Sequence, residues 1–521
     1  MTSDLSTGVW VLFLLKATRL LSCLLIVSAP TTAFTTQASE APPAIENGNV
    51  GAEPLSGNGW QPVVQGRLAN GLRYAILPRK GNDPGVSFRL RVGGGFLVEQ
   101  RPGERGLVHL LEHLIFHSPT RSAPNELRRF RQVGLPLTLP DPAGGTTSWR
   151  ESDYFVVSRT NQTADLDTLL GLFREVFSEL TLRADAVDGQ RAEVMREMAE
   201  RRLGNDLYAG YIRAVAPGSP TDLIDAQNSE DVPVASVATI RDLYHRLYRP
   251  ENITIVVVGD IDARAMQALI ERRFGDWRGT GPAPSDRAIP TFDRSRIVPI
   301  SYSSHPYGRN TAMLTLTMGL PPPSSSRAGQ IESMLMDMLV TKAVTNRLAV
   351  TRQDYPSGKF GMFIENGEQG HRTFIIWDDF VPGQWRLAAT GLSGMSCNLQ
   401  TTGFSEQEWT AAKQQLLDEL NWRANSMAGE SNFALAIELS NEVTNRRDLI
   451  PPNVLLAHAQ TWLPTINVRH GNDWWRHQWD AGAQHLRVEA SELARLSDAG
   501  SAIRSIVDEA RRTESCEALA Q

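Results

Sequence analysis

The chain has 521 residues, 41% of them hydrophobic, so it is long enough for two to four domains with sizeable buried cores. Its formal net charge of -6 is mild and its arginines are scattered without a basic stripe, which argues against a nucleic-acid-binding protein. Three cysteines, Cys23, Cys397 and Cys516, are too few for a disulfide scaffold or a cysteine-rich zinc site. Cys397 and Cys516 are either two free thiols, which we favour, or a disulfide formed in an oxidising compartment.

The N-terminus is typical of a secretory signal peptide, which we place at residues 1–38. Two short apolar runs, residues 9–15 and 20–27, flank the basic residues Lys16 and Arg19. Each run is shorter than the roughly 18–20 residues that a membrane span requires. We therefore expect an exported, periplasmic protein with no membrane span in the mature chain. The alternatives are a lipoprotein attached through Cys23 and a protein anchored in the membrane by its N-terminus.

A flexible linker rich in Ala, Pro, Gly and Ser is expected at residues 39–64, followed by a first unit at residues 65–278. Asn70-Gly71 predicts a hairpin turn between two alternating runs. Apolar periodicity then predicts a set of strands and helices in this unit. We expect strands at residues 86–92, 154–157 and 253–258, and helices at residues 106–117, 166–180, 185–202, 235–248 and 262–274.

Pro-rich residues 279–290 are typical of a linker, and the C-terminal unit at residues 291–521 repeats a similar order. We expect strands at residues 312–318, 360–364 and 373–377, and helices at residues 325–348 and 405–421. Residues 182–198 align without gaps with residues 404–420, so that Arg191 matches Lys413 and Glu197 matches Glu419. Two similar units explain this match most simply, although generic amphipathic periodicity could also produce it.

One motif carries chemistry: His109-Leu-Leu-Glu112-His113 on the helix expected at residues 106–117. Histidines four residues apart share one face of a helix, one turn apart, and can therefore bind one metal ion. A catalytic zinc keeps three protein ligands and a water, whose pKa it lowers. Glu112 is placed to act as the general base that takes a proton from this water. The C-terminal unit has no counterpart of this motif.

The third zinc ligand should come from another element, and the helix expected at residues 185–202 offers three candidates. Glu193, Glu197 and Glu200 all lie on it, and the physical chemistry of the residues does not choose among them.

The sequence resembles the insulinase-type, or pitrilysin-type, metallopeptidases, which carry the inverted zinc motif His-x-x-Glu-His. The similarity covers about residues 66–277. It includes Asn70-Gly71-Leu72, the segment GLVHLLEHLIFHSPT at residues 106–120, and YRPEN followed by ITIVVVGDID at residues 248–262. The family takes its third ligand from a Val-x-x-Glu segment. Residues 194–198, VMREM, match it, so the resemblance implies His109, His113 and Glu197 around one Zn²⁺ per chain.

The resemblance also implies an α+β fold, an α/β roll of two similar units. Each unit is expected to be a mostly antiparallel sheet with helices packed on one face. A peptide substrate would bind as an extended strand at a sheet edge that follows residues 144–148, contacting Gly145, Thr146 and Thr147. Arg352 would contact the substrate carbonyl from the second unit. Family members enclose substrate between two halves, and this chain resembles one half. A second copy or a related pitrilysin-type subunit is therefore expected to complete the chamber.

Several positions depart from the family pattern. Gln190 stands where the family usually has a second Glu, Gly144-Gly145 where it has Asn-Ala, and Lys359 or Phe360 where it has Tyr. A Gln can still form hydrogen bonds but brings no charge to the metal site. His117 is not a family ligand, and we interpret it as structural or exposed.

We expect a zinc endopeptidase that hydrolyses peptides or small unfolded proteins by attack of a metal-bound water activated by Glu112. The alternative is a non-catalytic pitrilysin-like scaffold or peptide-binding subunit of a larger complex. The intact motif favours the enzyme, whereas Gln190 and the missing Tyr favour the scaffold. A nucleotide-dependent oxidoreductase is disfavoured, because neither residues 93–95 nor residues 144–145 form a phosphate-binding glycine fingerprint.

Overall fold

A computed structural model gives the fold. It describes residues 61–80, 85–123, 126–135, 143–148, 151–198, 229–281, 300–304, 310–319, 326–352, 357–366, 371–425, 431–444, 447–481 and 483–516. The expected signal peptide and the linker up to residue 60 lie outside these ranges, as do Glu200 and most of the expected linker at residues 279–290.

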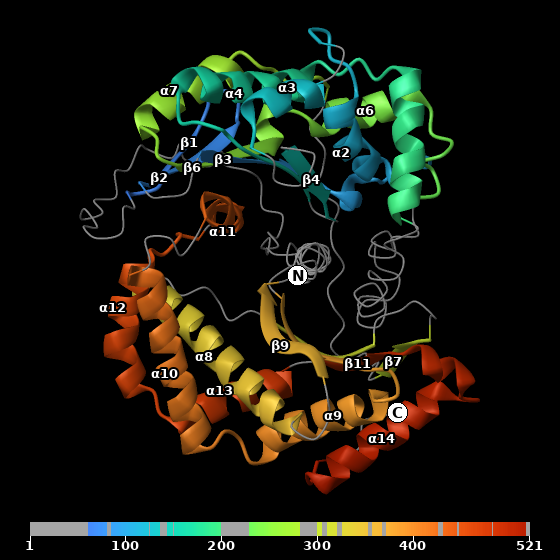
Figure 1. Ribbon diagram of the computed structural model, residues 1–521, viewed down its shortest axis with the longest axis vertical. Helices are drawn as coiled ribbons and strands as arrows, with labels where there is room; N and C mark the ends of the chain where they lie inside the picture. The colour runs from blue at the N-terminus through green and yellow to red at the C-terminus, as the bar shows by residue number, and fades with distance from the viewer. Residues whose placement is uncertain are drawn as a thin grey trace, which may run out of the picture.

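The first unit is a six-stranded sheet with helices on one face (Figure 1). Its strands are β1 (Val64–Arg67), β2 (Arg73–Pro78), β3 (Val86–Gly93), β4 (Ala143–Thr147), β5 (Glu151–Val157) and β6 (Ile253–Gly259). They lie in the order β1-β2-β6-β3-β5-β4, and β2–β6 is the one parallel pairing within this sheet. The mostly antiparallel sheet expected from the sequence is confirmed.

The helices of this unit are α2 (Leu107–His117), α3 (Glu126–Val133), α4 (Thr163–Ser178), a helix over residues 184–198, α6 (Val237–Leu247) and α7 (Ala263–Phe274). Short 3-10 turns occur at Phe96–Val98 and Pro250–Asn252. The apolar faces of these helices and alternate residues of the strands, including Phe88, Leu90 and Ile255, form one core. The predicted helices are confirmed within a few residues at each end, except that the C-terminal end of the helix expected at residues 185–202 lies outside the described residues.

The predicted Asn70-Gly71 turn joins β1 to β2. Gly71 has φ +94°, a left-handed conformation that glycine adopts without strain. The Asn70 side chain accepts a hydrogen bond from the Leu72 N–H, and the Leu68 N–H donates to the Leu72 carbonyl.

The second unit repeats this design with a five-stranded sheet in the order β7-β11-β8-β10-β9. Its strands are β7 (Ile300–Ser303), β8 (Thr311–Gly319), β9 (Ser357–Asn366), β10 (His371–Phe380) and β11 (Ala483–Glu489). Its helices are α8 (Arg327–Thr351), α9 (Trp385–Thr401), α10 (Glu406–Asn425), α11 (Asn432–Thr444), α12 (Pro452–Trp462), α13 (Val468–Ala481) and α14 (Ala499–Thr513), with 3-10 turns at Leu463–Thr465 and Ser491–Arg495. In Figure 1 the helical layers, apart from α11, lie outside the two sheets.

Helix α11 departs from the expected one-sided packing. It follows α10 in the second unit, yet its residues Leu435 and Leu439 pack on Leu77 and Val258, on the face of the first sheet opposite α2. The Asn432 side chain accepts a hydrogen bond from Arg79 and donates one to the Gly85 carbonyl. The first sheet therefore carries the helices of its own unit on one face and α11, from the second unit, on the other (Figure 1).

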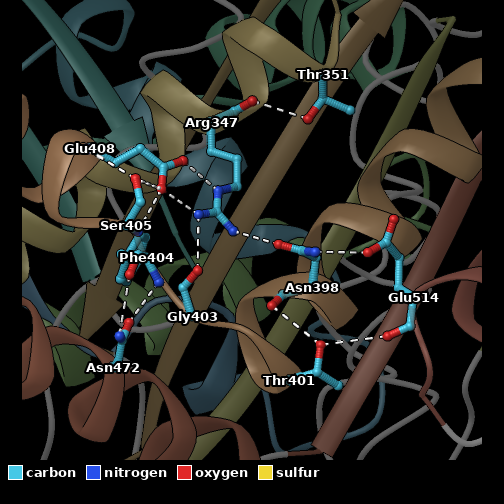
Figure 2. A network of polar contacts seen from close by, with 10 residues as sticks. All are labelled: Arg347, Thr351, Asn398, Thr401, Gly403, Phe404, Ser405, Glu408, Asn472 and Glu514. Carbon is cyan, nitrogen blue, oxygen red and sulfur yellow. Dashed lines mark hydrogen bonds and ion pairs between the residues drawn. The ribbon is translucent and has the colours of Figure 1, made fainter.

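Cys397, on α9, forms a disulfide with Cys516, just after α14, contrary to the free thiols that we favoured. Their Cα atoms are 6.0 Å apart and 119 residues separate them along the chain, so local sequence could not indicate the pairing. A polar network lies beside this bond (Figure 2). Arg347 donates to both carboxylate oxygens of Glu408 and to the Asn398 side chain, which in turn donates to Glu514.

Candidate metal centre

Helix α2 carries His109, Glu112 and His113, and a buried carboxylate holds its first turn. Glu99 accepts hydrogen bonds from the N–H groups of Gly106 (2.9 Å) and Val108 (2.8 Å), which have no partner inside the helix. Burial raises the pKa of Glu99 to about 8, against the opposite effect of these two donors. Glu99 was not among the sequence candidates, although an acid shortly before a helix start is a recognisable signal for such a cap.

The structure brings together the three residues expected to bind zinc. The Glu197 Oε2 atom lies 3.1 Å from His113 Nε2 and 3.7 Å from His109 Nε2. One ligand atom from each residue lies within 4.8 Å of the other two. A tetrahedral zinc ion with bonds of about 2.1 Å holds its ligand atoms about 3.4 Å apart. The two imidazoles and the carboxylate therefore fit a zinc ion in type and in separation.

Of the two candidate glutamates that the structure describes, Glu193 and Glu197, it is Glu197 that faces the histidines. Glu193 forms an ion pair with Arg196 on the outer side of the helix, where 47% of its side chain is exposed. Glu200 lies outside the described residues.

Gln190 lies on the same helix, where it contacts His113. The His113 Nδ1 atom is 3.3 Å from the Gln190 Oε1 atom, an oxygen that can only accept. Gln190 can therefore only accept from Nδ1, while Nε2 lies within hydrogen-bond distance of the Glu197 carboxylate, which also only accepts. Burial lowers the pKa of His113, but the hydrogen bond to Glu197 and the negative charges of Glu112 and Glu197 outweigh burial and raise it.

The Glu112 side chain extends from α2 toward the edge strand β4. A Cβ atom placed on Gly145 would approach the Glu112 Cγ atom to 2.7 Å and the Oε1 atom to 2.9 Å. The buried hydroxyl groups of Tyr154 and Tyr248 form a hydrogen bond with each other near this carboxylate. Burial raises the pKa of both phenols, and the charge of Glu112 adds to the effect. The Tyr pair was not predicted, because its two members are 94 residues apart.

Strand β4 lies at the end of the first sheet and pairs with β5 on its inner side. Among the described residues no strand pairs with its outer side. Gly145, Thr146 and Thr147 are half-buried along it, beside α2. The expected edge strand is therefore present, and it lies next to the candidate metal ligands.

Arg352, expected to contact substrate, is bound within the second unit. Its Nε atom is 2.8 Å from the Asp378 carboxylate, its Nη2 atom donates to the Asp379 carbonyl, and its guanidinium lies 4.3 Å from the centre of the Phe360 ring. With 2% of its side chain exposed, Arg352 is enclosed by these partners. His117 is exposed, as expected, and its Nδ1 atom lies 2.9 Å from the His113 carbonyl oxygen.

A family model described as insulinase (peptidase family M16) matches residues 74–207, which include all four residues of the site. A second, described as the peptidase M16 inactive domain, matches residues 235–350. The chain belongs to the insulinase-type M16 peptidase family. The predicted resemblance is therefore confirmed, and so is the pitrilysin-type α+β fold.

Other M16 members show what this chain is similar to. The probable zinc protease PqqL of Haemophilus influenzae is 22% identical over 404 residues, which are 76% of this chain and 42% of the relative. PqqL of Escherichia coli is 30% identical over 219 residues, which are 40% of this chain and 22% of the relative. The chain thus spans less than half the length of these relatives.

A solved structure shares the fold of this M16 chain. It is described as the first half of the periplasmic protease PqqL from Escherichia coli. Its TM-score is 0.71 at 20% identity, and the match covers 86% of this chain and 96% of the solved one. Among the described helices, none combines the length and apolar character needed to cross a bilayer.

Proposed function

We propose that this M16 chain is a zinc-dependent endopeptidase that hydrolyses peptides or small unfolded proteins, with Glu112 as general base. The observation that carries the proposal is the convergence of His109, His113 and Glu197, whose ligand atoms have separations that suit one zinc ion. The relatives named as zinc proteases support the same class of reaction.

A zinc ion at this position lowers the pKa of a water and polarises a peptide carbonyl. His109, His113 and Glu197 would hold the ion, and Gln190 would accept a hydrogen bond from His113 Nδ1 while Nε2 binds the ion. Glu112 takes the proton of the attacking water and delivers it to the leaving amine nitrogen.

The outer edge of β4 would hold the substrate main chain as an added strand. Gly145, Thr146 and Thr147 supply backbone N–H and C=O groups there, so binding depends little on the substrate sequence. We leave Arg352 out of the substrate contacts, because its guanidinium is buried against Asp378 and Phe360.

We further propose that the chain is exported to the periplasm and works with a second copy or a related M16 subunit. A signal-like N-terminus and a disulfide between Cys397 and Cys516 support export. The chain matches nearly all of a structure described as one half of a periplasmic protease, which supports a partner of similar size.

A non-catalytic peptide-binding subunit is the second candidate. It is favoured by Gln190, which replaces the second glutamate usual in the family and brings no charge to the ligand helix.

The two candidates are separated by measuring bound zinc and hydrolysis of a quenched peptide library. The proteins to compare are the wild type, Glu112→Gln, and the control Glu193→Gln on the exposed side of the neighbouring helix. We expect all three to bind zinc, the wild type and control to cleave, and Glu112→Gln to lose at least about 100-fold in rate. Equal cleavage by Glu112→Gln would show the mechanism to be wrong, and a zinc-loaded but inactive wild type would favour the scaffold.

A further inference from the structure

The candidate ligands come from two helices, and one short segment, residues 229–235, lies against both of them. On the side of α2, the Arg105 N–H donates to the Asp231 carboxylate, and the Arg105 side chain pairs with Glu230. A Cβ atom on Gly106 would lie 2.8 Å from the Ser229 Cα atom, so the two backbones are in close contact. The first turn of α2 therefore rests directly on residues 229–235.

On the side of the helix over residues 184–198, Arg191 makes the connection. Its two terminal nitrogens donate to the carbonyl oxygens of Val232 and Ala235, and its Nε atom donates to Asp188. Only 14% of its side chain is exposed, so these bonds are largely shielded from water. Arg191 follows Gln190 and precedes Glu197 by six residues, about 9 Å along the helix.

The same device recurs in the second unit. Lys413, the counterpart of Arg191 in the gapless alignment, donates to the carbonyl oxygens of Leu463 (3.4 Å) and Ile466 (3.1 Å). The two helices also begin at aligned positions, residue 184 and Glu406. The second unit has no His-x-x-Glu-His motif, so the hydrogen bonds of Lys413 hold a helix that carries no candidate metal ligand.

We propose that Arg191 is a positioning residue of the metal centre. By binding residues 229–235, on which α2 rests, it holds Glu197 and Gln190 at their distances from His113. The inference rests on the proposed metal site. In the second unit Glu419 of α10 takes the position of Glu197. It forms an ion pair with Lys342 of α8, so these two helices are joined by an ion pair.

The test is the zinc dissociation constant, measured by chelator competition well below the unfolding temperature. We expect Arg191→Met to weaken zinc binding by about 10- to 100-fold, the usual effect of losing an outer support of a ligand. Arg191→Lys should bind within a few-fold of the wild type, because Lys413 shows that an ammonium group reaches two carbonyls in this arrangement. Lys413→Met is the matched control. It removes the corresponding hydrogen bonds from the second unit and should leave zinc binding unchanged.

Asp231→Ala provides a second variant in case Arg191→Met does not fold, since it loosens the same segment from α2 at a less buried position. It should also weaken zinc binding. Wild-type zinc affinity in Arg191→Met would overturn the inference while leaving the proposed function intact. If Arg191→Met does not fold, wild-type zinc affinity in Asp231→Ala would have the same meaning. Equal weakening by Lys413→Met would also overturn it, by tracing the effect to general destabilisation. A wild type without zinc affinity would overturn both proposals.

Discussion

At the scale of single residues, Gln190 is placed to orient the His113 ring, since its side-chain oxygen lies 3.3 Å from Nδ1. This oxygen can accept a hydrogen bond from Nδ1, and a neutral ring protonated at Nδ1 has its Nε2 lone pair available for a metal ion. We expect Gln190→Leu to weaken zinc binding by about 10- to 100-fold, since the imidazole loses the partner that fixes its tautomer. Gln190→Glu restores an acceptor and should bind at least as tightly as the wild type. Chelator competition measures both, and unchanged affinity in Gln190→Leu would show that Gln190 does not orient His113.

His485 on β11 gives a pH-dependent prediction far from the metal site. Burial, together with the nearby charge of Arg487, lowers the pKa of His485 from 6.5 to about 4. Between these values the unfolded chain binds a proton that the folded chain does not, so stability falls as the pH drops from about 6.5 to about 4. The difference of pKa corresponds to about 3 kcal/mol. Urea unfolding should show a smaller loss over this range in His485→Gln, and an equal loss would contradict the lowered pKa.

At the scale of elements, α11 fastens the second unit to the first sheet. Leu439 is fully buried in a cluster with Leu77, Val256 and Val258. Leu439→Ala should lower the free energy of unfolding by about 2–5 kcal/mol through lost burial and the cavity that remains. Glu438→Ala, half-buried on the same helix, is the control. An unchanged urea midpoint in Leu439→Ala would show that α11 contributes little to the attachment.

The elements that could be predicted are those whose signals are local. The hairpin at Asn70-Gly71, helix α2 and strand β6 are each marked by a turn pair, a helical period or a β-branched run, and the structure has all three. Helices α11 to α14 lie beyond the last predicted element. The apolar residues of α11 fit a strand surface about 180 to 360 residues away, and this match cannot be read from the helix alone.

At the scale of the whole molecule, the disulfide joins α9 to the end of the last described helix. It closes a loop of 119 residues, and loss of such a bond costs about 2–5 kcal/mol in the chain-entropy account. Cys397→Ser with Cys516→Ser should therefore unfold at a lower temperature than the oxidised wild type, and reduction of the wild type should reproduce the shift. Identical melting of oxidised, reduced and doubly substituted protein would show that the bond does not stabilise the fold.

The site was predictable from the sequence in part. The four-residue spacing of His109 and His113 placed two ligands on one helix face without any tertiary information. Glu193, Glu197 and Glu200 could not be separated in that way, because the choice depends on how one helix is rotated against another. In the structure Glu197 faces the histidines and Glu193 pairs with Arg196. The supports of the site, Glu99, Arg191 and the Tyr154–Tyr248 pair, depend on contacts that spacing does not reveal.

The central claim is that two imidazoles on α2 and one carboxylate on the helix over residues 184–198 share a single zinc ion. The most direct test is the zinc content per folded chain, by elemental analysis after dialysis, of the wild type, Glu197→Ala and Glu193→Ala. We predict one zinc per chain in the wild type and in Glu193→Ala, and little or none in Glu197→Ala. Full zinc occupancy in Glu197→Ala would contradict the assignment.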